Sequence, residues 1–375
     1  MTRRRKEPKR SRGERCGHGP AIGAAVAVAF GALLAPAPTV AQDFPVSPSL
    51  PAESRQFDFW VGEWDVNLRI RQDDGSWPEA VRATAHVYPV LGGKAVLELW
   101  SDARVQGIKG YSLRYFDTAR DEWVLWLNWP GPNRSGSSSL AGSFRHGRGE
   151  FFSTRANPDG TETISRYTFS DITPTSLRWD DAFSSDGGRT WTNGWIMEFT
   201  RTGPKPTLDP AGGPAHTFHD GARCDDARFR RYEFLSGRRD GTVEAGGAGA
   251  VTITGYRVLD GCAVMTFAGP GSDPERAWGF SLVTFNSYAQ RYELTTVTSQ
   301  ASTPVRVFYS EPVDDASASG GTGAGPATLV LYEQVAEGER RDRMRIEHGE
   351  DGSVLWAHEA AAGDGWQPVW AGRVR

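Results

Sequence analysis

Short segments in which apolar and polar residues alternate follow one another along most of the chain after residue 60. They are rich in β-branched and aromatic residues and are separated by Gly, Asp and Ser clusters, which is typical of strands with one buried face. They are VLELW, YSLRYF, WVLWLNW, RYTFSD, WIMEFTR, VTITGYRV, FSLVTF, ELTTVT, VRVFYS, TLVLYEQV and RMRIEH. Helical periods are nearly absent beyond the N-terminus. The pattern predicts an all-β protein of antiparallel strands, arranged as a sandwich or an up-and-down barrel.

The strand pattern occurs twice, because the chain contains a tandem repeat. HVYPVLGGKAVLELW at 86–100 matches TGYRVLDGCAVMTFA at 254–268 without a gap. After a one-residue insertion, GYSLRYFDTARDEWVLW at 110–126 matches GFSLVTFNSYAQRYELT at 279–295. FDFWVGEWDV at 57–66 returns in altered form as YEFLSGRRDG at 232–241. Each copy is far longer than the repeat of a solenoid, so each is expected to be a domain.

The expected boundaries follow from composition. The repeats occupy residues 56–203 and 224–375, and the Pro/Gly-rich segment 204–223 joins them as a linker. Residues 42–55 form an N-terminal extension. A low-complexity stretch at 314–327 is expected to be a loop inside the second copy.

The first 41 residues have the features of a signal peptide. Eight Lys/Arg and two Glu in the first 18 residues precede an uncharged Ala/Gly-rich run that ends at Ala41. The protein is therefore expected to be exported, to the periplasm or beyond the cell, without stable membrane insertion after cleavage. Removing this leader, with its net charge of +6, from a chain of net charge −4 leaves roughly −10. This acidic balance excludes an electrostatic footprint for nucleic acid.

Two cysteines, Cys224 and Cys262, remain after the leader is removed. In an oxidising compartment they could form a disulfide, while Cys262 could equally be a small core residue. No metal site is expected, because the HTFH segment at 216–219 has no third ligand nearby.

Three motifs carry a family resemblance: F-D-F-x-x-G-x-W at Phe57–Trp64, L-x-G-x-x-x-x-E-x-W at Leu91–Trp100 and D-G-G-x-T-W at Asp186–Trp191. Together they resemble an uncharacterised bacterial family of lipocalin-like (calycin) β-barrel domains, well over 56–201 and weakly over 230–375. The resemblance implies two tandem antiparallel calycin-like β-barrels.

The resemblance also carries expectations for single residues. Trp64 would close one barrel end, with its indole N–H on a carbonyl, and Arg239 takes its place in the second copy. Haem-binding relatives carry G-x-W-x-G-x-G, whereas Val66 and Leu68 stand at the later glycine positions here, so no cofactor is expected. SSDGGRTW at 184–191 fits an Asp-box, which is expected to be a structural hairpin.

A candidate ligand site comes from the strand faces that mix a charge or amide with a large aromatic residue. The second copy replaces Glu98, Arg114, Trp126 and Asn128 by Thr266, Val283, Thr295 and Val297. The difference predicts two barrels with different interiors, the first polar and aromatic and the second mostly filled. The ligand-binding candidates are Trp60, Glu98, Trp100, Arg114, Trp126 and Asn128. A structural or surface role for these residues stays open.

The favoured function is an exported binding protein for an apolar or amphipathic small molecule in the N-terminal barrel. One alternative is a hydratase- or cyclase-type barrel enzyme, with Glu98 as general acid. Another is a non-catalytic scaffold, which predicts no ligand-sized pocket in either barrel.

Overall fold

The computed structural model describes residues 50–103, 109–132, 137–204, 206, 208–209, 213–214, 224–271, 273–299, 305–313, 327–336 and 339–375. The expected leader, most of the N-terminal extension, the 216–219 segment and most of the 314–327 stretch lie outside the described residues. Within the described residues, no helix is long and apolar enough to cross a membrane.

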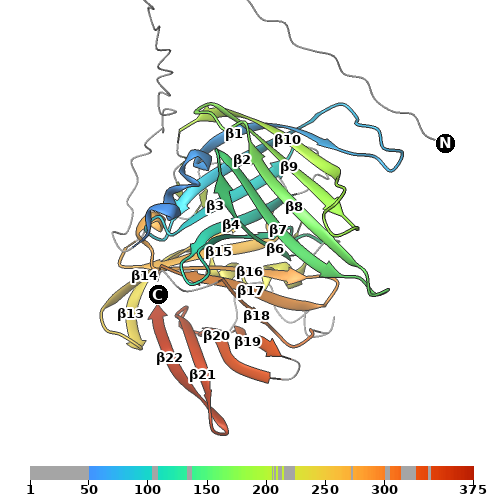
Figure 1. Cartoon of the computed structure of the whole chain (residues 1–375). Helices are drawn as coiled ribbons and strands as arrows, with labels where there is room; N and C mark the ends of the chain where they lie inside the picture. Colours follow the sequence, from blue (N-terminus) through green and yellow to red (C-terminus); the bar gives the residue numbers. More distant parts are fainter. Residues whose placement is uncertain are drawn as a thin grey trace, which may run out of the picture. The chain divides into compact units, whose positions relative to one another are not determined.

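Ten antiparallel strands close the first barrel, each paired with the next along the chain and β1 also with β10 (Figure 1). The strands are β1 (Gly62–Ile70), β2 (Val81–Val90), β3 (Ala95–Asp102), β4 (Lys109–Asp117), β5 (Glu122–Asn128), β6 (Ser137–Arg145), β7 (Arg148–Ala156), β8 (Glu162–Ser170), β9 (Ser176–Ser184) and β10 (Thr192–Gly203). The turns η1 (Ala52–Arg55) and η2 (Asp58–Trp60) precede them.

Ten further strands close a second barrel in the same order. They are β13 (Gly237–Ala245), β14 (Ala250–Val258), β15 (Ala263–Gly269), β16 (Gly279–Asn286), β17 (Arg291–Thr298), β18 (Arg306–Tyr309), β19 (Ala327–Ala336), β20 (Glu339–His348), β21 (Val354–Ala362) and β22 (Gly365–Val374). Short elements complete the described chain: β11 (Leu208–Asp209), β12 (Gly213–Pro214), α1 (Ala227–Arg230), η3 (Glu233–Leu235) and η4 (Pro274–Arg276). The prediction of an all-β protein with two tandem antiparallel barrels is confirmed.

Trp64 has the folding role that the sequence indicates. Its indole Nε1 donates to the Trp60 carbonyl at 2.9 Å, and its ring is buried. The Arg201 guanidinium lies 4.1 Å from the centre of the Trp64 ring and donates to the carbonyls of Phe59 and Val61. Gly62 has φ +149°, and a Cβ there would collide with Arg201, so the tight approach requires glycine. The indole and the guanidinium thus fix the η2 turn to the start of β1.

The second copy makes the corresponding turn with a different side chain. Arg239 stands where Trp64 stands in the first copy, and its guanidinium donates to the Ser236 carbonyl at 2.8 Å. The loss of tryptophan therefore leaves a side-chain contact to the backbone of the turn in place.

The Asp-box is a hairpin between β9 and β10. Asp186 accepts hydrogen bonds from the backbone N–H groups of Arg189 and Thr190, both at 2.9 Å, and from the Thr190 hydroxyl. These donors, with the Thr190 side chain first, lower the pKa of Asp186 to about 2. Trp191 closes the motif by donating to the Gly188 carbonyl at 3.0 Å. The Asp186 carboxylate therefore stabilises the turn of the hairpin.

The two barrels belong to one compact unit. The outward faces of β3, β4 and β5 share a buried apolar cluster with residues of the second barrel. Two hydrogen bonds cross this cluster: the Tyr111 hydroxyl to Thr295 Oγ1 at 3.0 Å, and the Val305 N–H to the Tyr115 hydroxyl at 3.1 Å. Every residue of β3 and β4 is consequently buried.

Candidate functional site

A buried ion pair occupies the interior of the first barrel. Arg114 donates to Glu98 Oε2 at 3.0 Å and to the Ser112 hydroxyl at 2.7 Å, and Ser112 in turn donates to Glu98 Oε2 at 2.7 Å. The side chains of Arg114 and Glu98 are only 3% and 7% exposed. Burial lowers the pKa of Arg114, and the Glu98 charge acts in the opposite direction. The two charges are therefore paired with each other inside the barrel, while Arg114 Nε is buried without a hydrogen-bond partner among the described residues.

Aromatic rings fill the space around this pair. The Arg114 guanidinium lies 4.8 Å from the centre of the Trp60 ring, and Trp100 packs edge-on against Trp195 at 5.6 Å. The cavity that remains between these groups is about 50 Å³. This is room for a few water molecules and is well below the few hundred Å³ of a small-molecule site. The geometry therefore gives Glu98 no space for the substrate of a hydratase or cyclase.

Four of the six predicted ligand-binding residues, Trp60, Glu98, Trp100 and Arg114, line this small cavity together. Trp126 and Asn128 do not. Trp126 is paired with Leu113 and Asn128 with Tyr111, on the wall face that is turned towards the second barrel. The expectation that all six share one interior is corrected, because Leu125 and Leu127 are the β5 residues that face inward with Arg114.

The second barrel contains the larger cavity, of about 720 Å³. The repeat explains why it is hollow. Trp100 of the first copy corresponds to Ala268, Glu98 to Thr266, and Trp129 to Thr298, so small side chains stand where large ones fill the first barrel. The expectation that the second barrel is mostly filled is wrong, because exchanging tryptophan and glutamate for alanine and threonine removes side-chain volume from the interior.

Hydroxyl groups and large apolar groups line different parts of this cavity. The hydroxyls belong to Thr266, Ser281, Thr296 and Thr298, which come from β15, β16 and β17, and to Ser299, which follows β17. The apolar wall consists of Ile253, Trp278, Phe308, Met344, Trp356 and Trp370. This is the composition of a small-molecule site, in which apolar walls surround a few polar groups.

A charged cluster closes one part of the cavity wall. Arg306 donates to both carboxylate oxygens of Glu333, at 2.7 and 2.6 Å, and pairs with Asp342. His358 Nε2 lies 3.2 Å from both the Arg306 guanidinium and Asp342 Oδ2. Burial acts to lower the pKa of Arg306, but the two carboxylates outweigh it, and the pKa is raised. Burial likewise acts to raise the pKa of Asp342, but Arg306 and His358 outweigh it, and the pKa is lowered. Arg306 and His358 are the members of the cluster that line the cavity.

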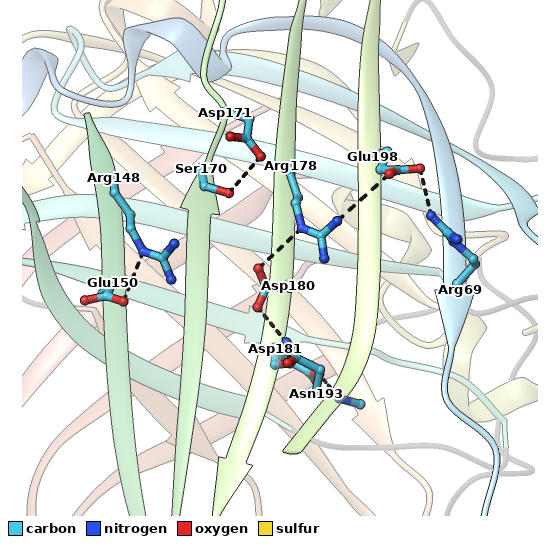
Figure 2. A network of polar contacts seen from close by, with 11 residues as sticks. Arg69, Arg148, Glu150, Ser170, Asp171, Arg178, Asp180, Asp181, Asn193 and Glu198 are labelled. Carbon is cyan, nitrogen blue, oxygen red and sulfur yellow. Dashed lines mark hydrogen bonds and ion pairs between the residues drawn. The ribbon is translucent and has the colours of Figure 1, made fainter. Parts of the chain in front are cut away.

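A second polar network lies on strands β7 to β10 and β1 of the first barrel (Figure 2). Arg178 lies between Asp180 and Glu198, at 3.8 and 4.0 Å. Beside it, Asp181 accepts the Gly194 N–H at 3.1 Å. Burial raises the pKa of Asp181 to about 7, backbone N–H donors oppose this rise, and the neighbouring Asp180 charge adds to it. Asp181 is the candidate proton-binding group of this network.

Cys224 and Cys262 form a disulfide in the structure, across 38 positions of sequence. It joins the segment before α1 to the turn between β14 and β15 of the second barrel. Among the residues that the structure describes, no group of three His, Cys, Asp or Glu side chains could hold a metal ion.

The fold and the cavity define an all-β, two-barrel protein with a ligand-sized cavity in its second barrel. No protein-family model matches the chain, and no curated protein matches it. Among solved structures, the chain is similar to a protein of unknown function from the DUF3598 family of Nostoc punctiforme PCC 73102. The two share 11% sequence identity over 87% of this chain and 99% of the other, with a TM-score of 0.19.

Sequence reasoning did not find the second-barrel site. Its charged members, Arg306, Asp342 and His358, come from β18, β20 and β21, which lie outside the repeat segments that align between the two copies. One signal was present: the inward positions of the repeat become smaller in the second copy, as in the change from Trp100 to Ala268.

Proposed function

We propose that this is an exported protein that binds an apolar or amphipathic small molecule, and that the second barrel holds it. The cavity of about 720 Å³ carries the proposal, because it has the size and the mixed lining of a small-molecule site. The N-terminal leader, with its basic start and uncharged run, supports export. The first barrel is the weaker location, since its cavity is about 50 Å³. A fully packed scaffold would have no ligand-sized cavity in either barrel.

The test fills the cavity with the residues of the other copy. Ala268→Trp with Thr298→Trp places in the second barrel the tryptophans that the first barrel has at Trp100 and Trp129. The full chain should bind the uncharged dye N-phenylnaphthylamine with one-to-one stoichiometry, measured by fluorescence titration, and the filled variant should lose that binding.

The matched control is Ala361→Trp, which adds the same ring at an exposed position of the second barrel. It should bind the dye as the wild type does. Unchanged binding in the filled variant would place the dye elsewhere and contradict the proposal. Native mass spectrometry of the exported protein from its own host should in addition show a stoichiometric extra mass, which identifies the natural ligand.

A further inference from the structure

Three hydroxyl side chains form a row across the wall of the second-barrel cavity. Thr266 is paired with Ser281, Ser281 with Thr296, and Thr296 with Arg306, on the consecutive strands β15 to β18. Directly paired residues of antiparallel strands have their Cβ atoms about 4.5–5.5 Å apart on the same face of the sheet. All four side chains line the cavity. The row therefore offers neutral donors and acceptors along one edge of a bound molecule.

A further hydroxyl lies on the same wall without a partner. Thr298 Oγ1 is buried and has no hydrogen-bond partner among the described residues. The tryptophans of the apolar wall, among them the edge-to-face pair Trp278 and Trp370, suit a nonpolar body.

The charged cluster at the end of the row disfavours a ligand that carries a charge. Arg306 is already paired with both Glu333 and Asp342, so its charge is neutralised within the cluster. A ligand carboxylate would lose its water and would have to compete for Arg306 with the two carboxylates that already hold it. A ligand ammonium would first meet Arg306 and His358, because these are the groups at the cavity surface. An uncharged oxygen meets neither obstacle.

We infer that the second barrel takes an uncharged amphipathic molecule whose hydroxyl or carbonyl oxygens lie on the Thr266, Ser281 and Thr296 row. Its apolar body packs against the tryptophans, Phe308 and Met344. The inference rests on the proposed function and adds the chemical class of the polar end.

The experiment compares three probes with the same chain and different head groups. Dodecanol, dodecanoate and dodecylammonium each compete with N-phenylnaphthylamine for the full chain at a pH of about 8, where a free carboxylate and a free ammonium are both charged. Dodecanol is expected to displace the dye at a concentration about tenfold lower than either ion, as one well-placed buried hydrogen bond provides. Equal or stronger displacement by dodecanoate or dodecylammonium, or no displacement by any of the three, overturns the inference.

Two variants connect the preference to named groups. Ser281→Ala with Thr296→Val removes two hydroxyls at nearly constant volume, so dodecanol should lose about tenfold in affinity while dye binding stays. Asp342→Asn removes one negative charge, so dodecanoate should gain affinity. No change in either variant contradicts the assignment. If the dye does not bind, or binds to the cavity-filled variant, the proposed function fails; if the dye binds in the cavity without a head-group preference, the inference alone fails.

Discussion

Breaking the ion pair inside the first barrel should cost far more stability than breaking an ion pair on its surface. The perturbations are Glu98→Gln and Arg114→Met, which remove one charge each and keep most of the side-chain volume. Each leaves an unpaired charge in a site where Glu98 and Arg114 are 7% and 3% exposed. Removing one partner of a buried pair costs about 3–5 kcal/mol, and we expect each single variant to be destabilised by that amount.

The double variant, Glu98→Gln with Arg114→Met, should be more stable than either single variant. With both charges gone, no unpaired charge remains in the barrel. The rings that now surround the Arg114 guanidinium, those of Phe57, Trp60 and Phe169, can pack against an apolar chain. Replacing a buried ion pair by groups of similar volume is often close to neutral, so the double variant should lie within about 2 kcal/mol of the wild type. The cycle then gives a coupling free energy on the order of several kcal/mol.

Urea unfolding followed by tryptophan fluorescence measures these free energies. Ten of the 14 tryptophans lie in the first copy, so the signal reports mainly on that barrel. The matched control is Arg69→Met, which breaks the surface pair with Glu198 shown in Figure 2. Its partners are 36% and 47% exposed, and a cost below about 1 kcal/mol is expected. Single variants that cost no more than this control, and that add without coupling, would refute the description of Glu98 and Arg114 as a packed structural pair.

Two further predictions concern protons and the disulfide. Because the pKa of Asp181 is raised to about 7, the wild type should lose stability as the pH rises from about 4 to about 7. The variant Asp181→Asn should lack this loss and be more stable than the wild type at a pH of about 8, by at most about 4 kcal/mol. Parallel unfolding free energies of the two proteins across this range would contradict the raised pKa. Replacing Cys224 and Cys262 by serine should lower the free energy of unfolding of the second barrel by about 4 kcal/mol, because the disulfide closes a loop across 38 positions and reduces the entropy of the unfolded chain. An unchanged thermal midpoint of the wild type under reducing conditions would count against a stabilising disulfide.

The architecture could be predicted from the sequence because it depends on local patterns and on the repeat. Alternating segments indicated strands, and the match between 86–126 and 254–295 indicated two copies of one domain. The role of Trp64 was predictable for the same reason, since its partner, the Trp60 carbonyl, is only four residues away.

The interior of the first barrel was harder to predict because alternation shows which residues share a face, and it does not show which face points inward. The usual guide is that the apolar face is buried. In β3 and β4 that guide fails, because every residue is buried, on one side in the barrel and on the other against the second barrel. Tyr111 and Leu113 form the apolar face of β4 and lie outside the barrel, while Ser112 and Arg114 lie inside. Trp126 was assigned to the wrong side for this reason.

The two barrels show how one fold can be either packed or hollow. In the first copy, the interior is filled by Trp100, Trp129 and the Glu98–Arg114 pair, whose two opposite charges lie against each other. In the second copy, the same strand positions carry small side chains, and the closed sheet of backbone hydrogen bonds still holds the wall. A closed barrel can lose side-chain volume from its interior in this way, because the backbone pairing of its wall does not depend on the core. The cost in packing falls on the copy that has the disulfide and that buries the outer faces of β15 to β17 against its neighbour. The cavity-filling variants therefore test the proposed binding by the second barrel, and the ion-pair variants separately test the packed interior of the first.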